Sequence, residues 1–159
     1  MAKSISQDIF ISQINPLLDE TFEQVMGIYL DKGTSLFETL QQISAVQATT
    51  PVSTGCASLA AKVKHVIFFI NVSERYIFTE DDFQVDWQEV WRTTREVTPA
   101  EWDSLRDELK SAYKHLRERI DAIENWNAER PLGGVIALIA HSAYHLGEIR
   151  QVVCDLKTE

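Results

Sequence analysis

The sequence predicts an all-α fold, a four-helix bundle with a long crossover between the second and third helices. Apolar residues recur at three- and four-residue spacing along four segments, which is the period of an amphipathic helix. No segment shows the strict two-residue alternation of a half-buried strand. One segment also begins with a complete helix-capping pattern. Four such helices bury their apolar faces most simply by packing around one core.

The length and composition of the chain predict a single domain that spans residues 1–159. Of the 159 residues, 45% are hydrophobic and 25% are charged, the balance of an ordinary globular domain. A formal net charge of −9 repels nucleic acids and anionic membrane surfaces, so we expect neither as a partner. No apolar stretch of the sequence is long enough to span a bilayer.

The first helix is predicted to run from about residue 15 or 17 to residue 44. Its apolar positions recur three or four residues apart at Leu17, Leu18, Phe22, Val25, Met26, Tyr29, Leu30, Leu36, Phe37 and Leu40. Gly33 interrupts this pattern at a cost of roughly 1 kcal/mol, so we expect a bend or a break there. A polar connector over residues 45–51 is predicted to follow.

The second helix is predicted to begin at a cap provided by Ser53 or Thr54 and to end near Tyr76. It carries two apolar stripes, one formed by Leu59, Val63, Val66 and Ile70 and the other by Ala61, His65, Phe68, Phe69 and Val72. A helix that is apolar on two sides is buried on two sides. Its neighbours are then either the other helices of the bundle or a second subunit.

Residues 77–97 are predicted to form the long crossover, with at most a short helical turn. The segment is rich in acidic residues and contains the aromatic residues Phe78, Phe83, Trp87 and Trp91. Long ordered loops in compact domains tend to be functional or to cover a site. Trp87 or Trp91 can therefore form the lid of a site, and structural packing is the alternative for both.

The third helix has the clearest start in the chain. Thr98 provides a capping hydroxyl, Pro99 fits the first helical position, and Glu101 completes a capping box. This helix is predicted to end near residue 123. After a polar stretch over residues 124–130, Pro131 can open the fourth helix, which is predicted to end near residue 156.

Two of the four histidines, His141 and His145, lie four residues apart on the predicted fourth helix. At roughly 100° per residue, both lie roughly 80–100° to one side of the core stripe of that helix. Their Cβ atoms are then about 5–6 Å apart, so both imidazoles can bind one divalent ion. The pair alone also fits two hydrogen-bonded histidines at the boundary of the core.

His65 is the candidate for a third ligand. It lies in an apolar stripe in the middle of the predicted second helix, where a buried imidazole needs a partner. Metal sites in bundles use side chains from facing helices, and the second helix can face the fourth. Three histidines with an open fourth position form a catalytic zinc site. A core histidine bonded to a backbone or hydroxyl group is the alternative for His65, and His115 is predicted to be an ordinary surface residue.

The two cysteines, Cys56 and Cys154, are isolated and form no C-x-x-C pair. Their spacing excludes a zinc finger, and the zinc-protease signature H-E-x-x-H is absent because Ser142 follows His141. Two isolated cysteines fit a reducing compartment. Residues 1–10 lack a basic segment followed by an apolar run, so we expect no signal peptide and a cytoplasmic protein.

The residues from His141 to Gln151, HSAYHLGEIRQ, resemble the fourth-helix signature of the DinB-like superfamily, which includes YfiT-type metal-dependent hydrolases and thiol-dependent S-transferases. Residues 31–36, 64–65, 85–91 and 101–105 also match patterns associated with this superfamily. The resemblance implies a four-helix bundle, often a homodimer, in which three histidines bind nickel or zinc. These histidines correspond to His65, His141 and His145, which are all present.

The function predicted from these residues is that of a divalent-metal-binding protein with one nickel or zinc ion per chain. The metal would activate a water or a thiol, as in a metal-dependent hydrolase or a thiol-dependent S-transferase that acts on a small-molecule substrate. Glu148, one turn beyond the histidine pair, is the candidate catalytic residue, either as a base or as a group that orients a ligand. The alternative is a non-catalytic dimeric bundle that binds a metal as a sensor or binds a small molecule.

Overall fold

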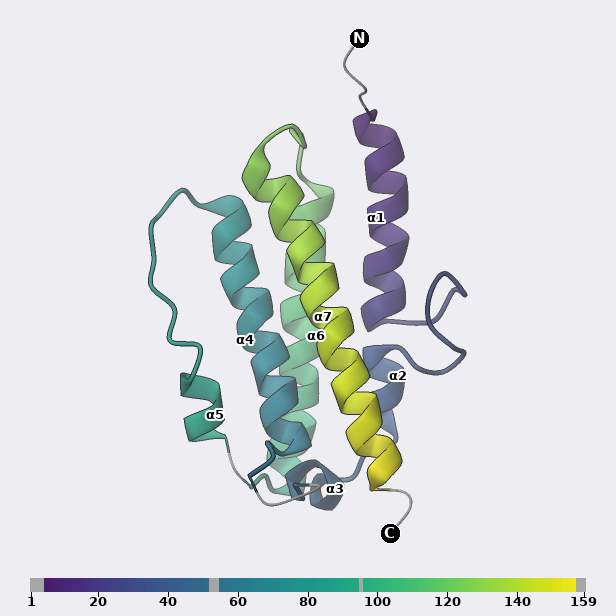
Figure 1. Ribbon diagram of the computed structural model, residues 1–159, viewed down its shortest axis with the longest axis vertical. Coiled ribbons are helices and arrows are strands. Elements are labelled where there is room, and N and C mark those ends of the chain that lie inside the picture. The colour runs from purple at the N-terminus through teal and green to yellow at the C-terminus, as the bar shows by residue number, and fades with distance from the viewer. Residues whose placement is uncertain (1–4, 52–54, 95, 157–159) are drawn as a thin grey trace.

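The computed structural model describes residues 5–51, 55–94 and 96–156 (Figure 1). Within these ranges the chain forms seven helices and no strand, so the prediction of an all-α fold is confirmed. None of the helices in the described part of the chain is both long and apolar enough to cross a membrane.

The four longest described helices lie side by side and enclose the core (Figure 1). They are α1 (Gln7–Phe22), α4 (Leu59–Phe78), α6 (Pro99–Asp121) and α7 (Glu129–Asp155). Helix α4 packs against both α6 and α7, and α1 packs against α7. Helices α6, α7 and α5 of the same chain thus all pack against α4, so the two apolar stripes of this helix do not require a second subunit.

Three short helices complete the described fold. They are α2 (Leu36–Gln41), α3 (Ala45–Thr49) and α5 (Glu89–Thr93). Helix α2 packs against α1, α3 packs against α4 and α6, and α5 packs against α4. Trp102 of α6 is almost fully buried and donates from Nε1 to the carbonyl oxygen of Ile43, which joins this end of α6 to the α2–α3 connection.

The prediction of one helix from residue 15 or 17 to residue 44 is wrong. Helix α1 begins earlier, after the N-cap Ser6, and ends at Phe22, and the chain is not helical again until Leu36. The cause is Glu20, which is fully buried and accepts hydrogen bonds from backbone amides of the residues that follow α1: Met26, Ile28, Tyr29 and Leu30. In a helix these amides would donate to carbonyl groups four residues earlier.

Two glycines allow the chain to turn in this segment. Gly27 has a φ of 83° and Gly33 a φ of 77°, values in the left-handed region that favours glycine. The break expected at Gly33 is therefore part of a longer non-helical segment over residues 23–35.

Several other helix boundaries also differ from the prediction. The polar connector over residues 45–51 contains α3, which is capped by Ser44 and Gln47. Ser53 and Thr54, the predicted caps of the second helix, lie outside the described residues, and the helix itself begins at Leu59 after the cap Ser58. The other long helices agree with the prediction to within about two residues, the usual uncertainty of helix ends.

The predicted start of the third helix is confirmed. The Thr98 hydroxyl accepts from the backbone amide of Glu101, and the Glu101 carboxylate accepts from the backbone amide of Thr98. Pro99 occupies the first turn, where its missing N–H leaves no hydrogen bond unmade. The complete capping box fixes where α6 begins after the irregular segment that holds α5.

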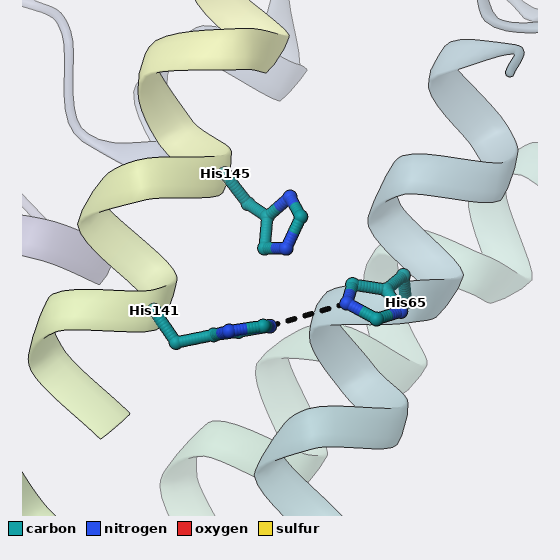
Figure 2. Close-up of side chains that lie close together, drawn as sticks. All are labelled: His65, His141 and His145. Carbon is teal, nitrogen blue, oxygen red and sulfur yellow. Dashed lines mark hydrogen bonds between the residues drawn. The ribbon is translucent and has the colours of Figure 1, made fainter. Parts of the chain in front are cut away.

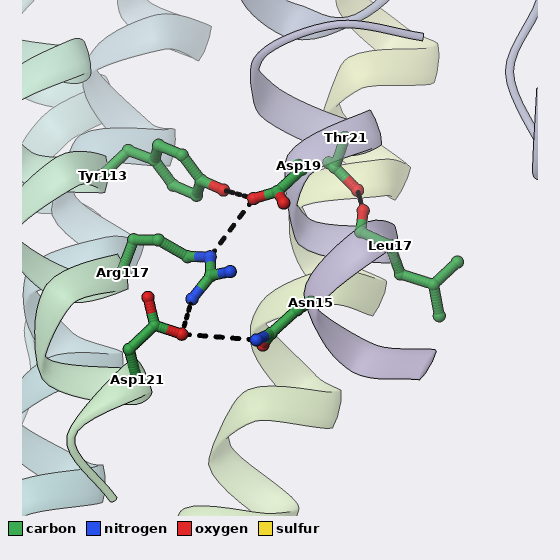
Figure 3. Close-up of polar contacts among 7 residues, drawn as sticks. All are labelled: Asn15, Leu17, Asp19, Thr21, Tyr113, Arg117 and Asp121. Carbon is green, nitrogen blue, oxygen red and sulfur yellow. Dashed lines mark hydrogen bonds and ion pairs between the residues drawn. The ribbon is translucent and has the colours of Figure 1, made fainter. Parts of the chain in front are cut away.

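A half-buried polar network joins α1 to α6 (Figure 3). The Asp19 carboxylate accepts from the Tyr113 hydroxyl at 3.1 Å and from Arg117 Nε at 3.2 Å. Arg117 also pairs with Asp121, which accepts a hydrogen bond from Asn15. Burial raises the pKa of the Tyr113 hydroxyl, and the charge of Asp19 raises it further, so this group remains a hydrogen-bond donor at neutral pH.

Gly134 of α7 lies directly against Ile77 of α4, and replacing Gly134 by alanine is expected to destabilise the protein. A Cβ atom at position 134 would lie 2.4 Å from Cγ1 of Ile77, so α4 and α7 would have to move apart or Ile77 would have to change rotamer. We expect a loss of about 1–3 kcal/mol in the free energy of unfolding, measured by urea denaturation.

Gly133→Ala is the matched control for Gly134→Ala. A Cβ atom at position 133 meets nothing within 4 Å, so the higher helix propensity of alanine is expected to leave stability unchanged or raise it. Equal stability of the two variants would contradict the close approach at Gly134.

Candidate metal centre

The structure brings together the three histidines that the sequence singled out as metal ligands. His65 comes from the middle of α4, and His141 and His145 come from the facing side of α7 (Figure 2). One ligand nitrogen from each ring can be chosen so that all three lie within 4.8 Å of one another. Packing of α4 against α7 is therefore what assembles the cluster.

The spacing of the rings fits a shared ion. Nε2 of His141 lies 3.2 Å from Nε2 of His65, and the centroid of the His145 ring lies 4.4 Å from that of His141 and 4.6 Å from that of His65. Two nitrogens bound to one tetrahedral zinc ion at 2.0–2.1 Å are about 3.4 Å apart. The separation of the His65 and His141 nitrogens is close to this value, and the donor set of three imidazoles suits nickel or zinc in chemistry.

Glu148 fixes the orientation of His145. Nδ1 of His145 lies 2.7 Å from Oε2 of Glu148. Because an ionised carboxylate can only accept, Nδ1 carries the proton and Nε2 keeps a free lone pair. A carboxylate that accepts from the outer nitrogen of a metal-binding histidine is a common support of such sites.

Glu148 is itself held by two further side chains. Lys62 of α4 places Nζ 3.3 Å from Oε2, and the Tyr144 hydroxyl donates to Oε1 at 3.2 Å. Burial raises the pKa of Glu148, but the hydrogen bond from His145 and the charge of Lys62 outweigh this and lower the pKa overall. Glu148 is thus a carboxylate at neutral pH. Gln151, one turn farther along α7, donates a hydrogen bond to Asp155.

His65 lacks an equivalent support. Its Nδ1 is buried, and no donor or acceptor among the described residues forms a hydrogen bond with it. In a metal-bound ring this nitrogen would carry a proton, since Nε2 is the atom that faces His141. Glu148 therefore fixes the orientation of His145, and no carboxylate among the described residues does the same for His65.

Two aromatic rings cover the outer histidine faces. Trp91 of α5 stacks on His65 with ring centroids 4.5 Å apart, and Phe69 of α4 stacks on His141 with centroids 3.5 Å apart. Trp87 lies one ring farther out, against Phe69 at 6.1 Å. Of the two candidate lid residues, Trp91 is thus the one that contacts a histidine, and Phe69 was not singled out from the sequence.

All three histidines are held in the neutral form that binds metals. Burial, together with a smaller effect of the nearby His145, lowers the pKa of His65 and of His141 to about 4. Burial also lowers the pKa of His145, although the hydrogen bond to Glu148 opposes this. At neutral pH each ring therefore keeps a lone pair on one of its two nitrogens, and a metal does not have to compete with the second proton of an imidazolium.

The metal-free protein is expected to lose stability as the pH falls from about 7 to about 4. In the unfolded chain the histidines bind protons near pH 6.5, whereas His65 and His141 in the folded protein do so only near pH 4. The unfolded state therefore binds more protons in this interval, and the free energy of unfolding falls by a few kcal/mol. Urea denaturation of chelator-treated protein measures this loss.

A His65→Gln, His141→Gln double variant should show a flatter pH dependence, while His115→Ala should resemble the wild type. His115 is the matched control because its side chain is 64% exposed and lies 3.1 Å from Glu74, away from the cluster. This position confirms the prediction that His115 is a surface residue. Equal wild-type stability at both ends of the interval would contradict the buried neutral state of the cluster.

Comparison of the chain with protein-family models, with curated proteins and with solved structures finds no match. The chemistry of the cluster is therefore inferred from its own geometry.

Proposed function

We propose that His65, His141 and His145 hold one divalent metal ion per chain, nickel or zinc. The observation that carries this proposal is the convergence of three imidazoles within 4.8 Å from two packed helices. Two further features support it, namely the neutral form of the rings and the hydrogen bond between His145 and Glu148. A cluster of buried imidazoles is costly unless each ring nitrogen is satisfied, and a shared ion satisfies three of them at once.

We further propose that the chain is a DinB-like four-helix bundle in which α5 belongs to the long crossover between α4 and α6. The support is the combination of the residues at 141–151 with histidine ligands from α4 and α7. With this assignment the protein is a metal-dependent hydrolase or a thiol-dependent S-transferase in the cytoplasm, acting on a small molecule. A bound divalent ion would supply a water or thiol of lowered pKa.

The residues around such a site would have different roles. The three histidines hold the ion, and Glu148 positions His145 through Nδ1. Trp91 and Phe69 keep water from the outer faces of His65 and His141. Since Glu148 lies on the outer side of His145, its contacts favour positioning over acting as a base.

Replacing Glu148 by glutamine is expected to lower the affinity for nickel or zinc about 10- to 100-fold. The amide lacks the negative charge that stabilises His145 with Nδ1 protonated, and it weakens the contact with Lys62. Competition with a chromophoric chelator measures the affinity. Glu108→Gln, at an exposed carboxylate on α6, is the matched control, and an unchanged affinity in Glu148→Gln would contradict the positioning role.

Catalysis is tested with metal-loaded protein and two substrate panels, one of activated esters and one of electrophiles paired with thiol cosubstrates. Turnover that disappears in the His65→Ala variant is the expected result. Stoichiometric metal binding without turnover in either panel would instead identify a non-catalytic metal-binding or sensor protein. Size-exclusion chromatography tests separately whether the chain forms the homodimer that the resemblance implies, and elution as a monomer would reject that assembly.

A further inference from the structure

A cavity of about 470 Å³ opens beside the histidine cluster, between α4, α7 and the segment that precedes α5. Aromatic side chains form much of its wall: Phe69, Tyr76, Phe83 and Trp87. Its volume lies within the range of small-molecule sites, which is about 300–1,000 Å³. The side chains of Tyr76 and Trp87 are 42% and 44% exposed, so these two rings present apolar surface at the opening.

The cavity shares one wall with the histidine cluster. Phe69 stacks on His141 and also lines the cavity, where Trp87 packs against it. None of the three histidines lines the cavity itself. The cavity is thus a separate site that adjoins the proposed metal centre through a single ring.

The charges of the cavity favour a positive ligand. Asp81 and Asp82 line it, both are exposed, and no cation of the described residues forms an ion pair with either carboxylate. Arg130 also lines the cavity, but its guanidinium donates to the carbonyl oxygens of Thr79 and Glu80. These hydrogen bonds hold the guanidinium on the backbone but leave its positive charge in place. The lining therefore carries two negative charges against one positive charge, and the two carboxylates are available to a ligand.

The aromatic wall suits the same kind of ligand. A cation near the face of an aromatic ring is attracted by the negative potential of that face. Phe83 already has the Arg75 guanidinium 4.2 Å from its ring centroid, and Tyr76 has that of Arg130 at 5.3 Å. The rings Phe69 and Trp87 carry no such cation among the described side chains.

We propose that this cavity binds an organic cation, a primary or quaternary amine with an aromatic or branched apolar body. The apolar body would lie against Phe69 and Trp87, and the ammonium group would lie beside Asp81 and Asp82. The net charge of −9 raises the local concentration of such a ligand. Binding at this site does not depend on a metal at the histidines, so the inference stands apart from the proposed function.

Calorimetric titration of the full chain with three probes of one shape tests the inference. The probes are 2-phenylethylammonium, neutral 2-phenylethanol and anionic phenylacetate. The cation is expected to bind at least about 10-fold more tightly than the alcohol, with phenylacetate weakest. The same order is expected for metal-free and for metal-loaded protein, so this test can be interpreted even if the metal proposal fails.

Two variants locate the site. Asp81→Asn with Asp82→Asn should reduce the preference for the cation over the alcohol to less than about 3-fold, whereas Trp87→Leu should weaken both probes. Asp107→Asn with Glu108→Gln, two adjacent exposed carboxylates on α6, removes the same charge elsewhere and should preserve the preference. Tighter binding of phenylacetate, an unchanged preference in the Asp81, Asp82 variant, or no binding of any probe would overturn the inference.

Discussion

Replacing His141 by alanine is expected to lower the affinity of the protein for nickel and zinc by at least about 100-fold. Loss of a supporting residue around a metal ligand typically reduces affinity 10- to 100-fold, so loss of a ligand should have a larger effect. His141 lies close to both other ligands, because its Nε2 is 3.2 Å from that of His65 and its ring centroid is 4.4 Å from that of His145. Competition with a chromophoric chelator at neutral pH measures the change.

The control for this experiment is His115→Ala, which removes the one histidine outside the cluster. Metal-free His141→Ala should remain folded, as judged by its circular dichroism spectrum, because the side chain that it removes is only partly buried. A His141→Ala variant with wild-type affinity would show that the metal binds elsewhere on the chain.

Replacing Glu20 by alanine is expected to reduce the free energy of unfolding by about 3 kcal/mol or more. The variant removes the acceptor for four backbone amides, those of Met26, Ile28, Tyr29 and Leu30, whose distances to the carboxylate range from 2.7 to 3.0 Å. Hydrogen bonds to a charged group contribute more than neutral ones, and here four of them are lost together. Urea denaturation measures the loss.

Glu20 should also affect how the stability of the protein depends on pH in acid. Burial raises the pKa of Glu20, but the hydrogen bonds from the four amides outweigh it and lower the pKa from 4.5 to about 2. Because the folded-state pKa is depressed, the stabilisation is present above about pH 4.5 and is lost as the pH falls towards 2. This interval overlaps the one in which the histidines take up protons only between about pH 4 and 4.5, so the two losses of stability can be separated.

Glu23→Gln is the matched control for Glu20→Ala, because Glu23 is an exposed carboxylate at the end of the same helix. Its stability should lie within about 0.5 kcal/mol of the wild type, as for most surface substitutions. Equal stability of the Glu20 and Glu23 variants would contradict the role of Glu20 in ending α1 and holding residues 26–30.

Apolar spacing predicted the all-α class but could not predict where α1 ends. Met26, Tyr29 and Leu30 continue the helical spacing of Leu18 and Phe22, and the structure nevertheless leaves them outside a helix. The deciding contact joins a buried carboxylate to amides six to ten residues farther on. Periodicity records only which side chains are apolar, so it carries no signal of such a contact.

The candidate site was easier to predict from the sequence because most of its residues are related by helical spacing. His141, His145 and Glu148 are three or four residues apart on α7, and this spacing alone places them near one another. His65 followed from the cost of an imidazole within an apolar stripe.

The aromatic surroundings of the site were harder to predict. Trp91 lies in α5, within the otherwise irregular segment between α4 and α6, and stacks on His65 of α4. This segment has no regular apolar spacing from which the contact could be predicted. Phe69 lies four residues after His65 on the same face of α4, and this spacing is the signal that could have identified it.

The metal content of the purified, untagged protein tests the central claim most directly. The protein is incubated with nickel or zinc, desalted and subjected to elemental analysis, alongside a variant in which His65, His141 and His145 are all alanine. The account predicts about one equivalent of metal per chain in the wild type and almost none in the variant. Less than about 0.2 equivalents in the wild type, or equal metal content in both proteins, would contradict it.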